Sequence, residues 1–471
     1  MKTLCDSDRI HFENLGKRDV IAEFNGGKIT SDAGGLLLRE VEMQTDIIKR
    51  LTGCFEDHRV ENKIEHTVEE LLSQRIYGLA LGYEDLNDHD TLRHDPAMAV
   101  ISGKNDPTGS DRRCERDKGK ALAGKSTLNR LELTPEKVDE KSEYKKIVAD
   151  HEKIDNLLID IFIESYSEPP KRIVLDADAT DDPIHGDQEG KFFQGYYKCY
   201  CYLPLYIFCE GHLLCARLRS SNIDASDGTT EELDRITERI RNVWPETEIV
   251  LRGDSGFCRN EIMSWCEMND VDYILGLAKN NRLKKLLARE MADAEAIYEE
   301  TAEPSRVYGD FYYKTLETWD ECRRVIGKAE YTSGGENPRF VVTSFDNNEI
   351  NRSDLYEKCY CARGDMENRI KEQQLFLFAD RTSTSVLRSN QLRLYFSSFA
   401  YVLMHALRCH GLKGSEPENA QCDTIRLKLL KIGAQVRVTV RKVWISLNEG
   451  YRFKELFNEI FQKLRPVSGM V

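Results

Sequence analysis

The spacing of hydrophobic and polar positions predicts most of the secondary structure in the middle of the chain. Residues 172–178 (RIVLDAD) form an apolar run typical of a buried strand, and residues 229–243 have the period of an amphipathic helix that ends before Pro245. The same reasoning gives further strands at 198–210, 213–219, 248–254 and 272–278, and a helix at 259–268. The second and third strands should form a hairpin through the turn at Gly211-His212.

The order of these elements predicts the fold class. A strand, an antiparallel hairpin, and two later strands that each follow a helix make the order of a ribonuclease H-like α/β domain. We therefore expect a mixed five-stranded sheet flanked by helices, with strand 172–178 beside strand 248–254. Residues 281–350 break the alternation with a helix and several short strand patterns, so we interpret them as a β-rich insertion before the last helices of the core.

The same patterns divide the chain into regions. The first part is mainly helical, and Glu168-Pro169-Pro170 marks its end. The alternating run QVRVTVRKVWI predicts one strand near the C-terminus, and the helix RFKELFNEIFQKL follows it. The expected regions are an N-terminal region at 1–168, a core at 169–280, the insertion at 281–350, a second part of the core at 351–410, and a basic strand-helix region at 411–471.

Composition adds limits on location and partners. The N-terminus carries charges where a signal peptide needs an apolar segment, and no apolar run approaches the roughly 20 residues of a membrane span, so we expect a cytoplasmic protein with no membrane partner. The fourteen cysteines contain no C-x-x-C pair, which indicates reduced thiols. The net charge of −14 opposes nucleic-acid binding as a general property. However, residues 381–471 hold fifteen lysines and arginines against six acidic residues.

Acidic residues stand at three places where this topology brings chain segments together. Asp176 and Asp178 are two residues apart on one strand, so both side chains lie on the same face. Asp254 ends the neighbouring strand in RGDSGF. A third carboxylate is expected from the later helix, where one face presents Tyr360, Arg363, Glu367, Lys371 and Gln374 at spacings of three or four.

Converging carboxylates suit phosphodiester chemistry. Cutting a phosphodiester requires an activated water or hydroxyl, in-line geometry and positive charge around the transition state, and two divalent ions about 4 Å apart supply all three. Magnesium prefers carboxylate oxygens. The sequence therefore predicts a site for two Mg²⁺ ions, with Mn²⁺ as a substitute.

Three segments carry a resemblance to a known family. LDADATDDPIHGDQEG, VLRGDSGF and YCARGDMENRIKEQ resemble the catalytic motifs of bacterial insertion-sequence transposases of the Asp-Asp-Glu (DDE) type. They are most similar to the group with a Tyr-x2-Arg-x3-Glu-x6-Lys signature. Tyr360, Arg363 and Glu367 match its spacing; Gln374 takes the place of the lysine, and Lys371 one turn earlier is a plausible substitute. The segments ITSDAGGLLLRE, GYEDLNDHDTLRHDP and LRLYFSSFAYVLMHALR extend the resemblance over nearly the whole chain.

The resemblance implies roles for individual residues. Asp178, Asp254 and Glu367 would be catalytic residues and metal ligands. The D-x-T pattern favours Asp178 over Asp176, which we take as an auxiliary catalytic carboxylate. Glu367 follows Asp254 by 113 positions, which leaves room for the insertion that the family implies. Expected DNA contacts are Tyr360 and Arg363 at the cleaved end, with Lys371 in the role of the signature lysine. Further candidates for DNA contact are Arg252, Lys279, Asn390 and Arg393.

The resemblance also implies an activity and partners. The enzyme would hydrolyse DNA at the ends of an insertion sequence and join the freed 3′-OH to another phosphodiester, which in this group can include a hairpin step. The N-terminal region would recognise the terminal inverted repeats of double-stranded DNA. Because two ends must be paired with target DNA, a homodimer is expected in the active complex. The site of action would be the bacterial cytoplasm, with the nucleoid when DNA is bound.

Two other functions compete with this interpretation. IVLDADAT also fits the D-x-D-x-T motif of haloacid-dehalogenase-like phosphatases, but an antiparallel hairpin breaks the parallel winding that those enzymes need. A calcium loop fails because Asp181 stands where the sharp-turn glycine belongs. A domesticated, non-catalytic DNA-binding protein is the other alternative. The presence of all three carboxylates argues against it.

Overall fold

The computed structural model describes residues 9–139 and 142–465, and it divides the chain into two compact units. Unit 1 comprises Met1–Val148 and Phe399–Val471, and unit 2 comprises Ala149–Ser398. These limits differ from the expected regions. Helix α7 (His151–Glu164) belongs to unit 2, because Ile159 and Phe162 are buried in the core of its large sheet. The C-terminal residues join the N-terminal ones instead of forming a region of their own.

Unit 1 is built from both ends of the chain. Its N-terminal elements are β1 (Arg9–Leu15), β2 (Arg18–Glu23), β3 (Lys28–Thr30), α1 (Leu36–Thr45), α2 (Ile47–Thr52), β4 (Phe55–Asp57), α3 (Val68–Ala80), α4 (His89–Leu92), α5 (Pro96–Ile101), α6 (Lys125–Glu132) and β5 (Ile147–Ala149). Its C-terminal elements are α15 (Cys422–Ile425), β18 (Ala434–Val438), β19 (Val443–Leu447) and α16 (Lys454–Leu464). Strand β18 pairs with β3 on one side and β19 on the other.

Local sequence signals explain several of these elements. Thr67 begins α3 with a capping box: its hydroxyl accepts a hydrogen bond from the Glu70 amide, and the Glu70 carboxylate accepts one from the Thr67 amide. The single strand expected from QVRVTVRKVWI is wrong. Thr439 and Lys442 exchange hydrogen bonds and turn the chain, so the segment forms the β18–β19 hairpin. Across the described residues, no helix is long and apolar enough to cross a membrane.

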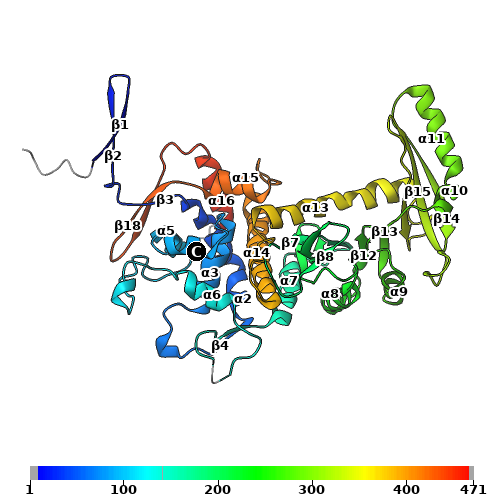
Figure 1. Ribbon diagram of the computed structural model, residues 1–471. Helices are drawn as coiled ribbons and strands as arrows, with labels where there is room; N and C mark the ends of the chain where they lie inside the picture. The colour runs from blue at the N-terminus through cyan, green and yellow to red at the C-terminus, as the bar shows by residue number, and fades with distance from the viewer. Residues whose placement is uncertain (1–8, 140–141, 466–471) are drawn as a thin grey trace, which may run out of the picture. The chain divides into compact units, whose positions relative to one another are not determined.

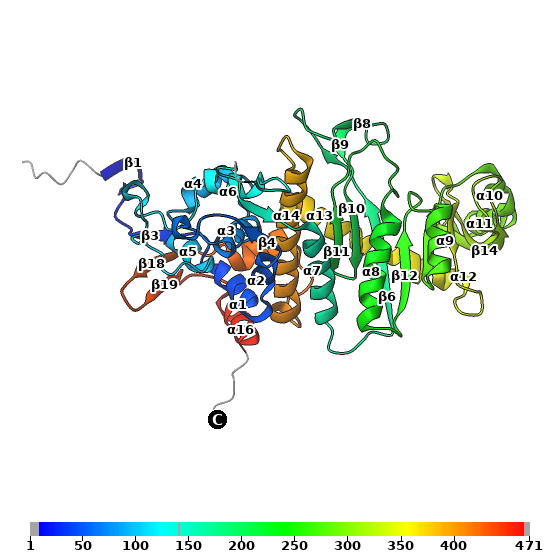
Figure 2. The ribbon, with the colours of Figure 1, turned by 90° about the horizontal axis from the view of Figure 1, so that it is seen from below.

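Unit 2 is organised around a mixed sheet that has nine strands in the described part of the chain (Figures 1 and 2). Its main order is β11-β10-β6-β12-β13-β17-β15-β14, and β16 pairs with β15. The strands are β6 (Arg172–Ala179), β10 (Leu205–Cys209), β11 (His212–Arg217), β12 (Glu248–Gly253), β13 (Asp272–Leu277), β14 (Ser305–Tyr313), β15 (Arg323–Thr332), β16 (Gly335–Glu336) and β17 (Arg339–Thr343). A small separate sheet contains β7 (Asp182–Pro183), β8 (Phe192–Gln194) and β9 (Cys199–Tyr202).

The central strands follow the predicted order. β6 pairs antiparallel with β10 and parallel with β12, and Arg252 lies opposite Asp176 in the register. The adjacent placement of these two strands is confirmed. The expected strand 198–210 is instead divided at Pro204 into β9 and β10, since proline lacks the amide that a sheet ladder uses.

The sheet is wider than the five strands expected. β17 pairs antiparallel with β13, and β15 and β14 continue the sheet beyond it. Residues of the expected insertion therefore extend the core sheet. Helices α10 (Asn281–Leu286) and α11 (Ala288–Thr301) pack against this part of the sheet.

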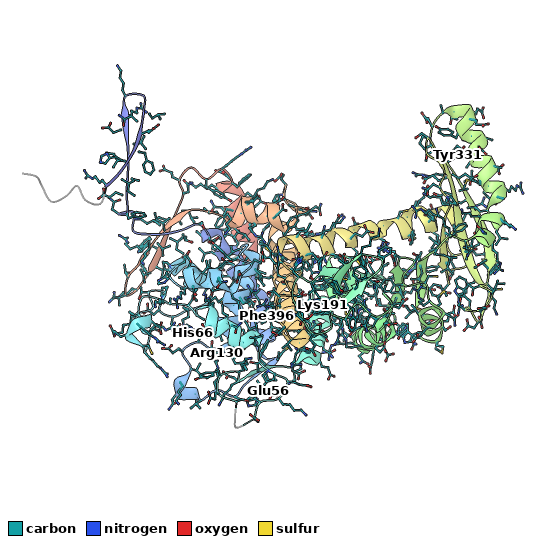
Figure 3. All side chains as sticks on the ribbon, viewed as in Figure 1. Glu56, His66, Arg130, Lys191, Tyr331 and Phe396 are labelled. Carbon is teal, nitrogen blue, oxygen red and sulfur yellow. The ribbon has the colours of Figure 1, made fainter. Side chains whose placement is uncertain are left out.

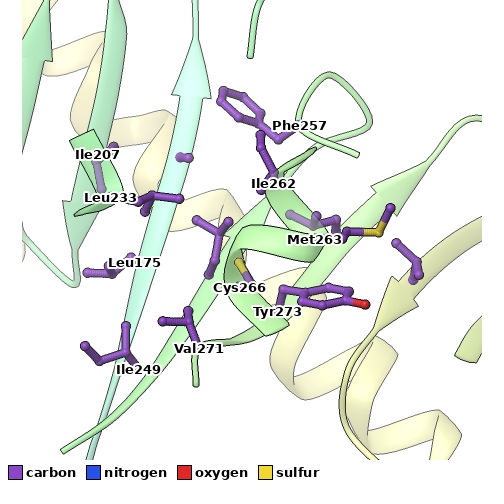
Figure 4. Packing of buried hydrophobic residues seen from close by; sticks show 14 of the residues in the cluster. Leu175, Ile207, Leu233, Ile249, Phe257, Ile262, Met263, Cys266, Val271 and Tyr273 are labelled. Carbon is purple, nitrogen blue, oxygen red and sulfur yellow. The ribbon is translucent and has the colours of Figure 1, made fainter. Parts of the chain in front are cut away.

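The alternation of side chains gives the sheet two different faces. On one face Leu175 and Ile249 pack with Leu233 of α8 (Thr229–Val243) and Met263 of α9 (Asn260–Met268), as Figure 4 shows. On the other face, Val250 packs with Leu355 and Tyr356. Figures 1 and 2 show α8 and α9 on one side of the strands and α13 (Gly364–Lys371) on the other.

A long, irregular helical segment crosses this second face. It comprises α12 (Arg352–Asp354), the π-helical turn η5 (Leu355–Tyr360), the 3-10 turn η6 (Cys361–Arg363), α13 (Gly364–Lys371) and the π-helical turn η7 (Glu372–Phe376). Helix α14 (Leu387–Leu407) follows after a break. Helical structure was expected from Leu355 to about His410, and the break at 377–386 is the main difference.

Candidate active site

Strand alternation directs the two aspartates of β6 to the face crossed by α13. Leu175 and Ala177 belong to the core on the opposite face, so Asp176 and Asp178 point to the α13 side. Asp254 follows β12 directly, and the parallel pairing of β12 with β6 brings it to the same end of the sheet. The local sequence therefore places these three carboxyl groups on one side of the sheet.

Asp176 and Arg252 form a buried ion pair. The Nη2 atom of Arg252 donates to Oδ2 of Asp176 at 2.7 Å, its Nε donates to Oδ1, and its Nη1 donates to the carbonyl oxygen of Cys359. Both side chains are at most one-tenth exposed. The pair ties β6 and β12 to the start of the helical segment, and the Arg252 guanidinium is engaged on all three nitrogens.

A cavity of about 500 Å³ contains the other three acidic residues. It lies within unit 2 and is lined by Asp178, Ala179, Thr180, Gln194, Tyr196, Tyr197, Leu203, Ala225, Asp254, Ser255, Gly256, Phe257, Arg363, Glu367, Ile370, Lys371 and Gln374. Asp178, Asp254 and Glu367 come from β6, the end of β12 and α13. Asp176 and Arg252 do not line it.

Arg363 occupies the space between two of these carboxylates. Its Nη2 donates to Oδ2 of Asp178 at 2.8 Å, and its Nη1 donates to Oε1 of Glu367 at 2.8 Å. The Nε atom of Arg363 is buried and has no hydrogen-bond partner among the described residues. Asp254 has a separate environment, since its Oδ1 accepts from the Gly256 amide at 2.8 Å. In this state a guanidinium holds Asp178 and Glu367 together.

Burial and charge perturb the acid–base properties of the site. Burial raises the pKa of Asp178 to about 6, although Arg363 opposes the increase; the negative charge of Asp254 adds to it. The pKa of Arg363 is raised, because the attraction of Asp178, Asp254 and Glu367 exceeds the effect of its burial. These shifts identify Asp178 as a carboxyl group whose ionised form needs a compensating cation.

The acidic residues do not form a compact ligand cluster in this state. Within residues 9–139 and 142–465, no group of three or more His, Cys, Asp or Glu side chains is arranged to hold a metal ion. The chemistry of the donors nevertheless suits a hard cation, because Asp178, Asp254 and Glu367 supply carboxylate oxygens to one cavity. Arg363 holds two of those three groups.

The expected DNA contacts lie in different environments. Lys371 lines the cavity, and Lys279 is exposed just after β13. Tyr360 is partly buried near Gly276, where an added Cβ would lie 2.5 Å from the Tyr360 hydroxyl.

Two other expected contacts come from α14. Asn390 is fully buried: its side-chain oxygen accepts from the Thr384 amide, and its Nδ2 donates to the Tyr202 hydroxyl. This amide stabilises the loop before α14. Arg393 is partly buried, and its Nη1 donates to the Ser383 hydroxyl at 2.6 Å.

Sequence reasoning missed part of the cavity wall. Gln194, Tyr196 and Tyr197 line it from the β8–β9 hairpin. Gln374, which the helix pattern did indicate, also lines it and donates to the Asp181 carbonyl at 3.0 Å. The aromatic run FFQGYYKCY, between a motif aspartate and the predicted hairpin, was the available signal.

Comparison with known proteins shows a family model that matches nearly the whole chain. A family model described as "Transposase DDE domain group 1" matches residues 12–468. A similar solved structure is titled "Cryo-EM structure of piggyBac transposase synaptic complex with hairpin DNA (SNHP)"; its TM-score is 0.41 and its identity 10%, and the likeness covers 85% of this chain and 80% of that chain. No curated protein matches. Asp178, Asp254 and Glu367 lie within the matched range.

Proposed function

Because the chain belongs to the transposase family with a DDE domain of group 1, we propose that it cuts DNA at the ends of a mobile element and transfers the cut strand to new DNA. The observation that carries this proposal is the cavity of unit 2, where Asp178, Asp254 and Glu367 from three separate segments meet. Enzymes that cut phosphodiesters with two metal ions use such a convergence of carboxylates to hold the ions.

The carboxylates of the cavity fit divalent metal ions. Asp178, Asp254 and Glu367 would hold two Mg²⁺ ions, or Mn²⁺ ions in their place. Bound ions would activate the attacking oxygen and neutralise charge on the transferred phosphate. Asp176 takes an auxiliary part, since its pair with Arg252 fixes β6 against β12.

Arg363 has to release Asp178 and Glu367 before these groups can hold ions. A DNA phosphate offers the guanidinium an alternative partner with matching bidentate geometry. We therefore assign Arg363 to the backbone of the cleaved end, with Tyr360 and Lys371 beside it. Lys279 is exposed and Arg393 is partly exposed. Both are secondary candidates for contacts with the flanking DNA.

The proposal extends to the architecture and the partners. The order β11-β10-β6-β12-β13 supports a ribonuclease H-like core that is extended by β17, β15 and β14. We propose that unit 1 recognises the terminal inverted repeats and that two copies pair the two ends. The proposal also includes a bacterial insertion-sequence origin, membership of the Tyr-Arg-Glu-Lys group, and action in the cytoplasm and at the nucleoid.

One experiment separates this function from its alternatives. Purified protein with Mg²⁺ is incubated with linear DNA that carries the ends of the element, and products are resolved on denaturing gels. We expect a sequence-specific nick at the end that Glu367→Gln abolishes. Binding without cleavage by the wild-type protein would favour a non-catalytic DNA-binding protein. Turnover of a small phosphate ester that survives Glu367→Gln would favour a phosphatase.

A further inference from the structure

The β8–β9 hairpin exposes a group of aromatic rings that the proposed chemistry does not use. We define the aromatic hairpin as residues 192–200, which hold β8, a turn and the start of β9. Tyr196 in the turn is 85% exposed, Phe193 57%, Tyr200 51% and Phe192 43%. Figure 2 shows β8 and β9 beyond the β10–β11 hairpin, within unit 2. Apolar rings gathered in this way on a protein surface indicate an interaction site.

The aromatic hairpin is attached to the wall of the candidate active site. Gln194, Tyr196 and Tyr197 line the same cavity as the acidic residues. The Tyr197 hydroxyl donates to the carbonyl oxygen of Ala179, the residue after Asp178, at 3.2 Å. The Gln194 amide donates to the Ser221 carbonyl at 3.0 Å. These bonds fix the position of the exposed rings at the edge of the cavity.

The rings pack against one another, and one of them lies beside the positive charge of a lysine. Phe193 and Tyr200 are cross-strand partners whose ring centroids lie 5.5 Å apart, edge to face. Tyr196 and Tyr197 have the same arrangement at 4.9 Å. The ammonium group of Lys191, labelled in Figure 3, lies 5.1 Å from the centroid of the Tyr200 ring. The hairpin thus offers flat apolar surfaces beside a cation, which suits a ligand with flat rings and negative charge.

The chemistry of DNA identifies which part of it fits this surface. Aromatic side chains bind nucleobases by stacking on their faces, and nearby lysines attract the phosphates. In a duplex these faces are covered by neighbouring base pairs, and only base edges are open in the grooves. Bases present their faces where they are unpaired. We propose that the aromatic hairpin stacks on unpaired nucleobases next to the bond that is cut.

This inference rests on the proposed function but is tested without cleavage. The probes are a 20-base-pair duplex with a blunt end and the same duplex with a four-nucleotide single-stranded tail that carries 2-aminopurine. Binding and 2-aminopurine fluorescence are measured in EDTA. Because stacking tolerates any base, the probes need no element sequence. The binding and fluorescence results therefore remain interpretable even if the protein shows no nicking that depends on Glu367.

The variants compare Tyr196 with a matched exposed tyrosine. We expect the tailed duplex to bind the wild-type protein about tenfold more tightly than the blunt one and its 2-aminopurine to be quenched, since stacking contributes about 1–3 kcal/mol per base. Tyr196→Ala should remove both effects, and Tyr196→Trp should retain them. Tyr312→Ala, a control on β14 that is 68% exposed, should match the wild type.

Two results would overturn the proposal. Equal binding of both probes by the wild-type protein, with no quenching, would mean that the rings do not stack on unpaired bases. An unchanged preference in Tyr196→Ala and in the double variant Phe193→Ala/Tyr200→Ala, together with a changed oligomeric state by light scattering, would assign the hairpin to a protein interface. Circular dichroism of each variant verifies folding.

Discussion

Asp176 and Asp178 share one face of β6 but have different partners. Asp178 faces the cavity and Arg363, whereas Asp176 is buried against Arg252. The sequence predicts their common face from the two-residue spacing, but it cannot assign their partners, because Arg252 stands on another strand and Arg363 on a helix far along the chain. The two aspartates therefore differ through tertiary contacts, which the local sequence does not encode.

The buried pair predicts a stability effect at Asp176. Asp176→Ala leaves the Arg252 guanidinium buried without its carboxylate, which should cost about 3–5 kcal/mol in the free energy of unfolding. Urea denaturation followed by circular dichroism measures this loss. The double variant Asp176→Leu/Arg252→Met, which removes both charges, should recover most of it. A loss below about 1 kcal/mol in Asp176→Ala would contradict a structural role for the pair.

The contacts of Arg363 predict that its guanidinium competes with added metal ions for Asp178 and Glu367. In Arg363→Ala, Asp178 and Glu367 lose the guanidinium that holds them, so Mg²⁺ or Mn²⁺ should bind about tenfold more tightly without DNA, the equivalent of one charge-assisted hydrogen bond. The rise in melting temperature with metal concentration reports this affinity. Lys371→Ala removes a different cation from the same cavity and should behave as the wild type. An unchanged metal response in Arg363→Ala would refute the competition.

At the scale of elements, the predicted secondary structure agrees with the observed one where the local hydrophobic pattern is strong. The helix expected at 229–243 is confirmed as α8, and the strands expected at 248–254 and 272–278 are confirmed as β12 and β13. The single C-terminal strand was wrong, because the segment forms the β18–β19 hairpin. The residues of the expected insertion extend the core sheet through β17, β15 and β14. Edge pairing such as β13 with β17 depends on contacts about 70 residues apart, which residue periodicity does not encode.

Close packing between β13 and the helical segment predicts a sensitive glycine. A Cβ at Gly276 would lie 2.5 Å from the Tyr360 hydroxyl and 3.0 Å from the Ser255 amide nitrogen. Gly276→Ala should therefore displace the end of β12 that carries Asp254, cost about 1–3 kcal/mol of stability and lower DNA cleavage at least about tenfold. Chemical denaturation and nicking assays measure the two effects.

Helix α13 itself provides the control for that substitution. A Cβ at Gly364 would have no neighbour within 4 Å, and the residue has helical dihedral angles. Gly364→Ala should raise stability by about 0.5–1 kcal/mol, because alanine loses less entropy in a helix. If both glycine variants lost stability equally, the close approach at Gly276 would not be the cause.

At the scale of the whole molecule, the chain folds unit 1 from two segments that unit 2 separates in sequence. Strand β3 pairs with β18, and the Lys431 ammonium forms an ion pair with the buried carboxylate of Asp32 at 2.5 Å. We expected residues 1–168 to form a region without the C-terminal residues. The local pattern of residues 411–471 does not show that this segment pairs with the N-terminal one. The carboxylates of the candidate site could be found because strand order and motif spacing together constrain them.

This arrangement predicts that the C-terminus is required for the N-terminal fold. Ending the chain after Leu430 removes Lys431, β18, β19 and α16, and it leaves Ala33 without the core formed by Ile432 and Ala434. Hydrogen exchange should therefore show loss of protection in β3 and α1, while β6 and β12 retain theirs because their pairing lies wholly in unit 2. Protection of β3 unchanged by the truncation, or lost equally in β6, would show that the two units are not the separate folding bodies that their contacts indicate.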